Sequence, residues 1–136
     1  MINHRITEGL STVYKKETTS NDAYSSSDTG TMDYLVSTPA IVTMMIDAAT
    51  EMLDKLLPPD YITVGKKIDL FHEHPSIIGE TISLKLVVKK LAGNTVMLDV
   101  QAADSKGVVC SGKIERAVIN KDKLIEIAYK RTPDII

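Results

Sequence analysis

The sequence predicts one α+β domain, residues 1–136, in which an antiparallel sheet of about five strands wraps around a long central helix. Residues 38–57 carry apolar side chains at helical spacing and almost all round, which is typical of a buried helix. The segments after it alternate apolar and polar residues with the period of two that strands have. A single sheet folded around a single apolar helix satisfies both burial patterns at once.

Composition and charge fit this class and exclude others. Hydrophobic residues make up 43% of the chain and charged residues 25%, as in ordinary globular proteins. The net charge of −2 gives no electrostatic basis for binding nucleic acid, so we expect no nucleic-acid partner. We expect no membrane partner either, because the apolar run 39–49 is too short to span a bilayer and no leader-like apolar stretch follows the first residues.

The single cysteine, Cys110, excludes an internal disulfide and gives no support to a zinc site. A cytoplasmic location is therefore the simplest expectation. Its place on an apolar strand face favours a small core residue over a nucleophile.

The spacing of Asp69, His72 and His74 is a weak metal motif, because on a strand Asp69 points to the opposite face. We expect no metal.

A strand and a loop are predicted before the helix. Residues 11–18 fit a first strand. The segment 18–37 begins with a stretch rich in Ser, Thr, Asn, Asp and Gly, which predicts a long mobile loop of the kind that forms a lid over a binding site. Tyr24 and Tyr34 flank this loop. Tyr34 is a candidate substrate contact, and both tyrosines would serve equally well as ordinary loop anchors.

The central helix has clear ends. Thr38 is a good N-cap and Pro39 suits the first helical position. Two prolines stop the helix after Leu57. Its polar positions fall on one narrow stripe: Thr43, Asp47, Thr50, Glu51 and Asp54.

Four strands follow the helix, and each has one apolar face. These faces are Ile62, Val64, Ile68 and Leu70 with His72; Ile82, Leu84, Leu86 and Val88; Val96, Leu98, Val100 and Ala102; and Val108, Cys110, Ile114 and Val118. Turn residues between the last three predict an antiparallel meander. Gly65 interrupts the first of the four, which indicates a bulge or the close approach of a ligand.

A short amphipathic helix closes the chain, with Leu124, Ile127 and Ala128 expected to face inward and residues 132–136 forming a loose tail. An open sheet leaves an edge strand, and pairing with a second copy is a common way to cover it. We therefore expect a homodimer, with any higher assembly left open.

His72 is the strongest candidate for chemistry. It shares a face with apolar residues at the end of a strand, and histidine titrates near neutrality, so it can act as base or acid. A structural histidine with satisfied nitrogens explains the position equally well. His74 belongs to the following turn and is more typical of a loop histidine. The Thr38 hydroxyl has a capping role, and beside the free N–H groups of a helix start it would also position a carbonyl or a water.

Arg116 is charged, yet it shares a strand face with Ile114 and Val118. Either it reaches past the end of the sheet, or it pairs with an acid at an interface. Arginine also suits the phosphates of a ligand such as coenzyme A.

Four segments of the sequence together resemble one known family. They are VSTPAIVTMM at 36–45, TVGKKIDLFH at 63–72, Pro75 with Gly79 and Glu80, and GKIER at 112–116. Their order and content resemble the fluoroacetyl-CoA thioesterase-like branch of the hot-dog superfamily over nearly the whole chain. The resemblance implies a hot-dog fold and hydrolysis of an acyl-CoA thioester at a dimer-interface site. It implies no cofactor beyond the coenzyme A of the substrate.

The resemblance also implies roles for single residues. In that family a threonine at the helix start, a glutamate about two turns later and a histidine at the end of the second strand form the catalytic set. Thr38 and His72 match the first and last of these. Gly65 matches a glycine close to the thioester, and Arg116 matches an arginine of the fifth strand, so both are candidate substrate-binding residues.

The glutamate is absent from this sequence. Counting from Thr38, its position is taken by Ile46. Asp47 is the next residue and a possible alternative carboxylate, but on an ideal helix it points about 100° away and its side chain is one methylene shorter. We therefore predict that Asp47 belongs to the polar stripe.

Three functions remain open on the sequence. An acyl-CoA thioesterase is the first hypothesis. A site that keeps only Thr38 and His72 would lose the factor of about 10² to 10⁴ in rate that a positioned acid or base contributes, but it would still hydrolyse the thioester. A non-catalytic acyl-CoA-binding protein is the alternative that Ile46 favours. A hydratase is the third, and the lack of a histidine on the helix counts against it. The acyl group is not identified.

Overall fold

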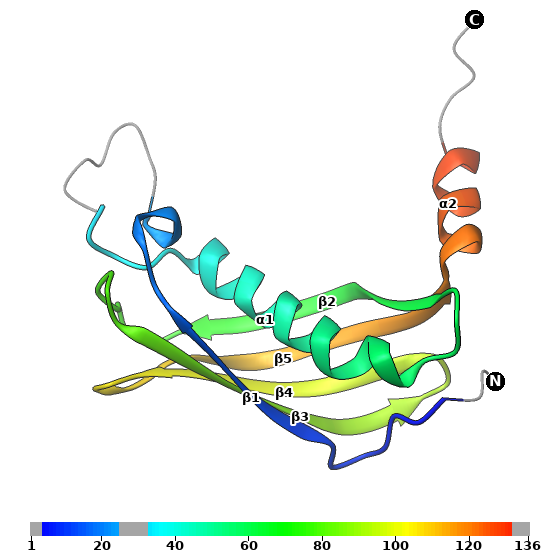
Figure 1. Ribbon diagram of the computed structural model, residues 1–136, viewed down its shortest axis with the longest axis horizontal. Coiled ribbons are helices and arrows are strands. Elements are labelled where there is room, and N and C mark those ends of the chain that lie inside the picture. The colour runs from blue at the N-terminus through cyan, green and yellow to red at the C-terminus, as the bar shows by residue number, and fades with distance from the viewer. Residues whose placement is uncertain (1–3, 25–32, 132–136) are drawn as a thin grey trace, which may run out of the picture.

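A computed structural model describes residues 4–24 and 33–131. Five strands form one antiparallel sheet in the order β1-β3-β4-β5-β2 (Figure 1). The elements are β1 (Ser11–Glu17), η1 (Ser20–Asp22), α1 (Thr38–Leu53), η3 (Asp54–Leu56), β2 (Tyr61–His72), β3 (Thr81–Ala92), β4 (Thr95–Asp104), β5 (Gly107–Asn120) and α2 (Lys121–Lys130). The predicted fold class, a five-stranded antiparallel sheet around a long helix, is confirmed.

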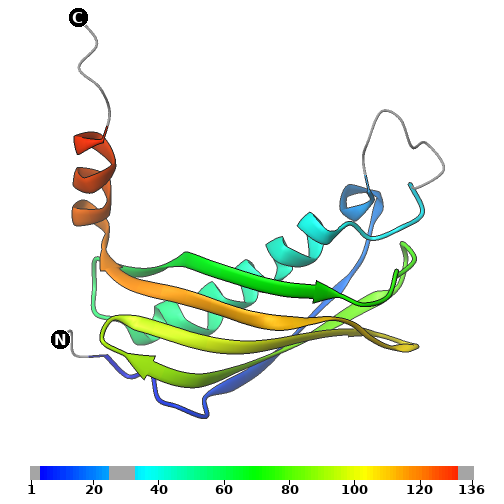
Figure 2. The same ribbon diagram turned by 180° about the vertical axis from the view of Figure 1, so that it is seen from behind.

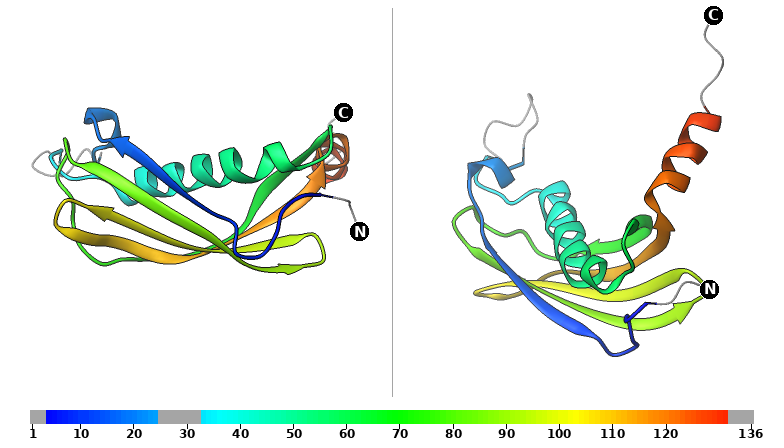
Figure 3. Two further views of the ribbon diagram at one scale, coloured as in Figure 1. Left: turned by 60° about the horizontal axis from the view of Figure 1, so that its bottom comes forward. Right: turned by 45° about the vertical axis from the view of Figure 1, so that its right-hand side comes forward.

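α1 lies across the concave face of the sheet, and the core fills the space between them (Figure 3). The opposite face of the sheet carries no helix of the described residues (Figure 2). The fully buried residues of α1 form one face: Ile41, Met44, Met45, Ala48, Ala49, Met52 and Leu53. The other face is exposed in the single chain and includes Ile46 at 37% exposure. The helix is therefore less completely buried than its composition predicts.

The start of α1 differs from the prediction by one residue. Ser37 is the N-cap, because its side chain accepts the hydrogen bond of the Ala40 N–H, and Thr38 is the first helical residue. The prediction of Thr38 as N-cap is wrong, and its hydroxyl is free for another contact. The regular helix ends at Leu53 and tightens into η3, so the two elements together end at Leu56, one residue before the predicted Leu57.

A bulge in β2 decides which side chains face the helix. The register shifts between Gly65 and Lys67, as the glycine predicted. An extra residue reverses the alternation, so the face that meets α1 changes from odd to even residues. The predicted common face is therefore wrong for Ile62 and Val64, because Thr63 is the buried residue before the bulge. Beyond the bulge the prediction holds, and the inward positions are Ile68, Leu70 and His72.

The predicted apolar faces of β3 and β4 are confirmed in full, since all eight residues are buried. β5 departs from the prediction at its start. A register shift against β4 buries both Val109 and Cys110, while Val108 is only partly buried. The Cys110 side chain is inaccessible, and burial raises the pKa of its thiol, as expected for a core cysteine.

α2 rises from the end of β5 on the same side of the sheet as α1 and stands apart from the rest of the domain (Figures 1 and 3). The helix was predicted, but its inward packing is not observed: Leu124 is partly buried and Ile127 is 44% exposed.

Residues 25–32 of the predicted lid and the predicted loose tail 132–136 lie outside the described residues. The described part of the segment 18–37 is not all loop, because it contains η1 and an isolated bridge between Ala23 and Val36.

Candidate functional site

The start of α1 and the end of β2 bring two candidate residues together. The Oγ1 of Thr38 lies 2.6 Å from the Nδ1 of His72. His72 faces α1 because the β2 bulge reverses the strand's alternation, and Thr38 is available because Ser37 takes the capping role. A hydroxyl in hydrogen-bond contact with an imidazole is the arrangement of an activated nucleophile and its base.

The second ring nitrogen of His72 is unusual. Nε2 is buried and has no hydrogen-bond partner among the described residues. An unpartnered buried polar atom costs about 1–3 kcal/mol, so it calls for an explanation in each structure where it occurs. In catalytic histidines this second nitrogen is the one that an orienting group holds. The chain therefore presents a nucleophile–base pair without its third member.

A pocket of about 340 Å³ opens over the pair. Its lining residues are Tyr24, Leu35, Val36, Ser37, Thr38, His72, Glu73, His74 and Pro75. His74 is held by the backbone, since its Nδ1 lies 3.1 Å from the Val108 carbonyl oxygen. Tyr24 belongs to the lining. Tyr34 is not one of the lining residues and is 71% exposed, so its substrate contact stays a prediction.

The amides at the start of α1 are mostly occupied. Pro39 has no N–H, the Ala40 N–H is bonded to the Ser37 side chain, and the Ile41 N–H is bonded to the Ser37 carbonyl. Thr38 is left as the residue of this turn whose N–H has no partner among the described residues. Because Thr38 lines the pocket, this amide and the positive end of the helix dipole lie beside it.

Gly65 and Arg116 lie together, but elsewhere in the chain. They are Cα partners on β2 and β5, whereas His72 pairs with Cys110. Seven residues of strand separate Gly65 from His72, which is roughly 23 Å at 3.3 Å per residue. Within the chain, neither residue reaches the Thr38–His72 pair.

Arg116 is 3% exposed and is held by the chain itself. Its guanidinium donates to the Thr63 side chain and carbonyl and, at 2.9 Å, to the Thr50 hydroxyl of α1. Burial lowers the pKa of Arg116, and the nearby charge of Asp54 acts in the opposite direction. The contacts join α1 to β2 just before the bulge, which gives Arg116 a role in positioning that the sequence pattern did not predict.

Asp47 lies on the flank of α1 away from His72. The hydrogen bond that Lys16 on β1 donates to Asp22 raises the pKa of Lys16, and the charge of Asp47 adds a smaller effect of the same sign, which is consistent with Asp47 on the β1 side of the helix. β1 and β2 are the two opposite edges of the sheet. This geometry supports the interpretation of Asp47 as part of the exposed polar stripe.

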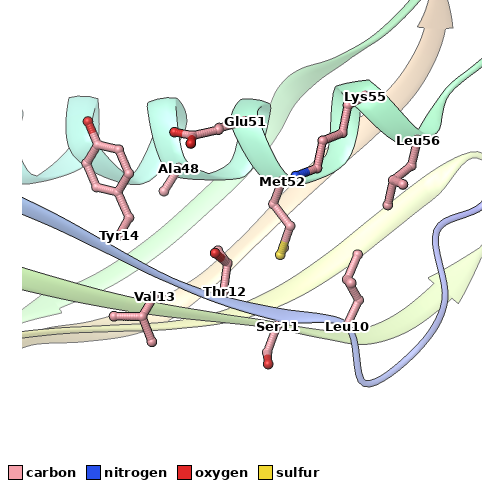
Figure 4. Close-up of a pocket in the computed structure, with 10 residues that line it drawn as sticks. All are labelled: Leu10, Ser11, Thr12, Val13, Tyr14, Ala48, Glu51, Met52, Lys55 and Leu56. Atoms are coloured by element: carbon pink, nitrogen blue, oxygen red, sulfur yellow. The ribbon is translucent and has the colours of Figure 1, made fainter.

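A second pocket, of about 200 Å³, lies between β1 and α1. Figure 4 shows Met52 pointing from the helix toward β1, with Glu51 and Lys55 on the helix beside it. Glu51 is one turn from Asp47, which agrees with the placement of that flank over β1. The pocket contains no nucleophile–base pair, so the chemistry favours the pocket at Thr38 and His72.

Comparison with known proteins identifies the family. The family model described as fluoroacetyl-CoA-specific thioesterase matches residues 17–122, which include both members of the pair and the bulge. The chain belongs to the fluoroacetyl-CoA-specific thioesterase family. None of the curated protein sequences compared with it gives a significant match.

Solved structures agree with the fold of this family. A hot-dog-like protein from Thermanaerovibrio acidaminovorans is 25% identical, with a TM-score of 0.85 and 94% of each chain covered. The fluoroacetyl-CoA thioesterase FlK is 20% identical, with a TM-score of 0.86, covering 95% of this chain and 99% of that one. A thioesterase superfamily member from Thermus thermophilus is 20% identical, with a TM-score of 0.84 and 93% of each chain covered. The hot-dog fold expected from the sequence is thus confirmed.

The described helices include none that is long and apolar enough to cross a bilayer. The described residues also include no cluster of three or more side chains that could hold a metal ion.

Proposed function

We propose that the protein is an acyl-CoA thioesterase whose site is the Thr38–His72 pocket. The observation that carries the proposal is the 2.6 Å contact between the Thr38 hydroxyl and His72 Nδ1, open to a pocket at a helix N-terminus. Membership of a thioesterase family supports the reaction class.

His72 acts as the base and Thr38 as the nucleophile. As His72 Nδ1 takes the hydroxyl proton, Oγ1 attacks the thioester carbonyl, and the developing oxyanion meets the Thr38 N–H and the helix dipole. The C–S bond breaks, and the coenzyme A thiolate leaves with the proton held by His72. A water, deprotonated by His72, then cleaves the ester on Thr38 and releases the acid. Buried Nε2 takes no part in these proton transfers.

The functional unit is a homodimer joined through the free edge of β2. β2 pairs with β5 on one side only, and an unpaired edge invites a second strand. Ile46 of α1 and Ile68 of β2 are exposed apolar side chains along this edge, at 37% and 40% exposure. Two-fold pairing would cover both and would bring Gly65 and Arg116 of one subunit toward the site of the other, where they are proposed to contact substrate.

The second candidate function is acyl-CoA binding without hydrolysis. It is favoured by the unpartnered Nε2 of His72 and by Ile46 in place of an acid, because a base without its orienting group is a weak catalyst. Such a protein would have the same pocket and the same ligand class, with turnover too slow to matter.

Thiol release from a panel of short and long acyl-CoAs tests the proposal. The wild type should release thiol, and His72→Ala should lose on the order of 10² to 10⁴ in rate while staying folded. His74→Ala is the matched control, because that histidine lines the same pocket but is bonded to the backbone. An active, folded His72→Ala protein would refute the catalytic assignment. Binding without release by the wild type would move the protein to the second function.

A further inference from the structure

Exposed apolar side chains gather at three places in the subunit. One group includes Tyr24, which lines the pocket, with Tyr34 and Ile77, which are the chain neighbour and the bridge partner of the lining residue Leu35. The second lies along the β2 edge and consists of Ile46 and Ile68. The third lies on α2: Ile125, Ile127 and Tyr129, at 53%, 44% and 74% exposure. A ten-residue helix with three large exposed apolar side chains that packs little on its own domain is typical of a helix that contacts another surface.

The mouth of the pocket and α2 lie at opposite ends of β2. His72 is the last residue of the strand, and Tyr61 is the first. Tyr61 is the Cα partner of Asn120, which is the N-cap of α2. Figures 1 and 3 show α2 rising at the end of the sheet opposite the start of α1, on the side that α1 covers.

A two-fold axis through the middle of β2 exchanges these ends. With both α1 helices on one face of a continuous sheet, the two β2 strands must run antiparallel. Pairing along the whole strand sets His72 beside Tyr61 of the second copy. The base of the second copy's α2 is then two strand spacings from His72, which is roughly 10 Å. The same operation that covers Ile46 and Ile68 therefore brings the other two apolar groups together.

Charge is complementary at the same place. α2 and its C-cap carry Lys121, Lys123, Lys130 and Arg131 against Asp122 and Glu126. The lining of the pocket includes one exposed acid, Glu73, and a second exposed acid, Asp33, lies two residues before the lining residue Leu35. A basic helix end over an acidic rim favours this arrangement over one in which α2 faces solvent.

We propose that α2 of the second copy forms the outer wall of the Thr38–His72 pocket, with its apolar side chains against Tyr24 and the acyl part of the substrate. This inference rests on the proposed homodimeric thioesterase. Each site would then be incomplete in a single subunit: one copy supplies nucleophile and base, and the other supplies the wall that keeps bulk water away from the thioester. The ligand class that this wall suits is a thioester with an apolar acyl group.

Mixing two inactive variants tests the wall through activity. The first variant carries both Ile125→Asp and Ile127→Asp, which remove the apolar side chains of α2. The second variant, His72→Ala, removes the base. In a mixed dimer, the intact base of the first subunit faces the intact α2 of the second, so activity should return to about a quarter of the wild-type level after random exchange of subunits. No return of activity would show that α2 serves its own subunit and would overturn the proposal. Val13→Asp, an exposed apolar residue on β1, is the control that should leave activity unchanged.

Crosslinking tests the placement without relying on hydrolysis. Cys110 is fully buried, so introduced cysteines will be the reactive ones. Tyr24→Cys combined with Ile125→Cys should give a covalent dimer with a short bismaleimide, whereas Val13→Cys with Ile125→Cys should not. Crosslinking without any thiol release would retain the α2 wall and refute the thioesterase. Thiol release without crosslinking, from a protein that is dimeric in solution, would retain the thioesterase and refute the α2 wall.

Discussion

The Thr38 hydroxyl lies 2.6 Å from His72 Nδ1, although 34 residues separate them in the chain. Two local events place them there. Ser37 takes the N-cap, which frees the Thr38 hydroxyl, and the bulge after Gly65 turns His72 toward the helix. The site therefore depends on a cap and a bulge as much as on the two residues that carry its chemistry.

Separating the cap from the nucleophile gives the first prediction. Thr38→Ala should abolish thiol release and change the free energy of unfolding by less than about 0.5 kcal/mol, while Thr38→Ser should keep activity. Ser37→Ala, its neighbour, should instead cost about 1 kcal/mol of stability, because it removes the cap. Urea unfolding and thiol release measure the two effects. A mass increase on Thr38 during turnover would identify the acyl intermediate, and an active Thr38→Ala protein would disprove it.

Restoring an acid to the helix gives the second prediction. Ile46 is 37% exposed in the single chain, so a glutamate there points toward the proposed dimer interface and not into the core of its own chain. Ile46→Glu should raise the rate of thiol release by on the order of 10² if the site lacks only its third member. Ile46→Gln is the matched control, since it has the same shape without the charge. Equal rates for both variants would mean that a carboxylate at this position does nothing here.

Arg116 gives the third prediction. Replacing this buried guanidinium with methionine should cost about 2–3 kcal/mol, because it removes hydrogen bonds from a charged donor and leaves Thr63 and Thr50 without their partner. The midpoint of urea unfolding measures this cost. A stable Arg116→Met protein with a raised KM for acyl-CoA would instead make contact with substrate its main role.

Two glycines on the inward face give the fourth prediction. A Cβ on Gly112 would collide with the Asp69 carbonyl oxygen, whereas a Cβ on Gly65 would have no atom of the described residues within 4 Å. Gly112→Ala should therefore lower the free energy of unfolding by about 2–4 kcal/mol, and Gly65→Ala should leave it nearly unchanged. If Gly65→Ala still raises KM for acyl-CoA, a ligand approaches that backbone closely. An unchanged KM would remove Gly65 from the binding residues.

The fifth prediction concerns pH. Burial opposes ionisation of Asp22, but hydrogen bonds from Lys16 and from the Thr19 N–H outweigh it and hold the pKa of this carboxyl below its ordinary value. Because the pKa of this carboxyl is lower in the folded than in the unfolded state, its ionised form stabilises the fold. This stabilisation is fully present when the pH is above the unfolded-state pKa of roughly 3.9, and it is lost as the pH falls through the folded-state pKa. Asp22→Asn should cost about 1–2 kcal/mol at pH 7 and progressively less below pH of about 4. A pH-independent difference in thermal unfolding would exclude Asp22 from this role.

The sequence determined the elements and their order. Apolar residues at helical spacing located α1, and the alternation of period two located the strands and the faces of β3 and β4, because burial on one side imposes those periods whatever the partner is. It also indicated the bulge at Gly65, since a glycine inside a strand marks one, and it placed Thr38 and His72 at the ends of their elements.

The tertiary structure decided the relations between elements. Which residue caps α1 was decided by the backbone at the helix start, where the Ser37 side chain accepts the Ala40 N–H, because both Ser37 and Thr38 are residue types that cap helices. Which residues of β2 face inward depended on the register across the bulge, which shifts every side chain after it to the other face. The partners of Arg116 and the flank on which Asp47 lies are contacts between distant segments, and only the packing of α1 on the sheet brings those segments together.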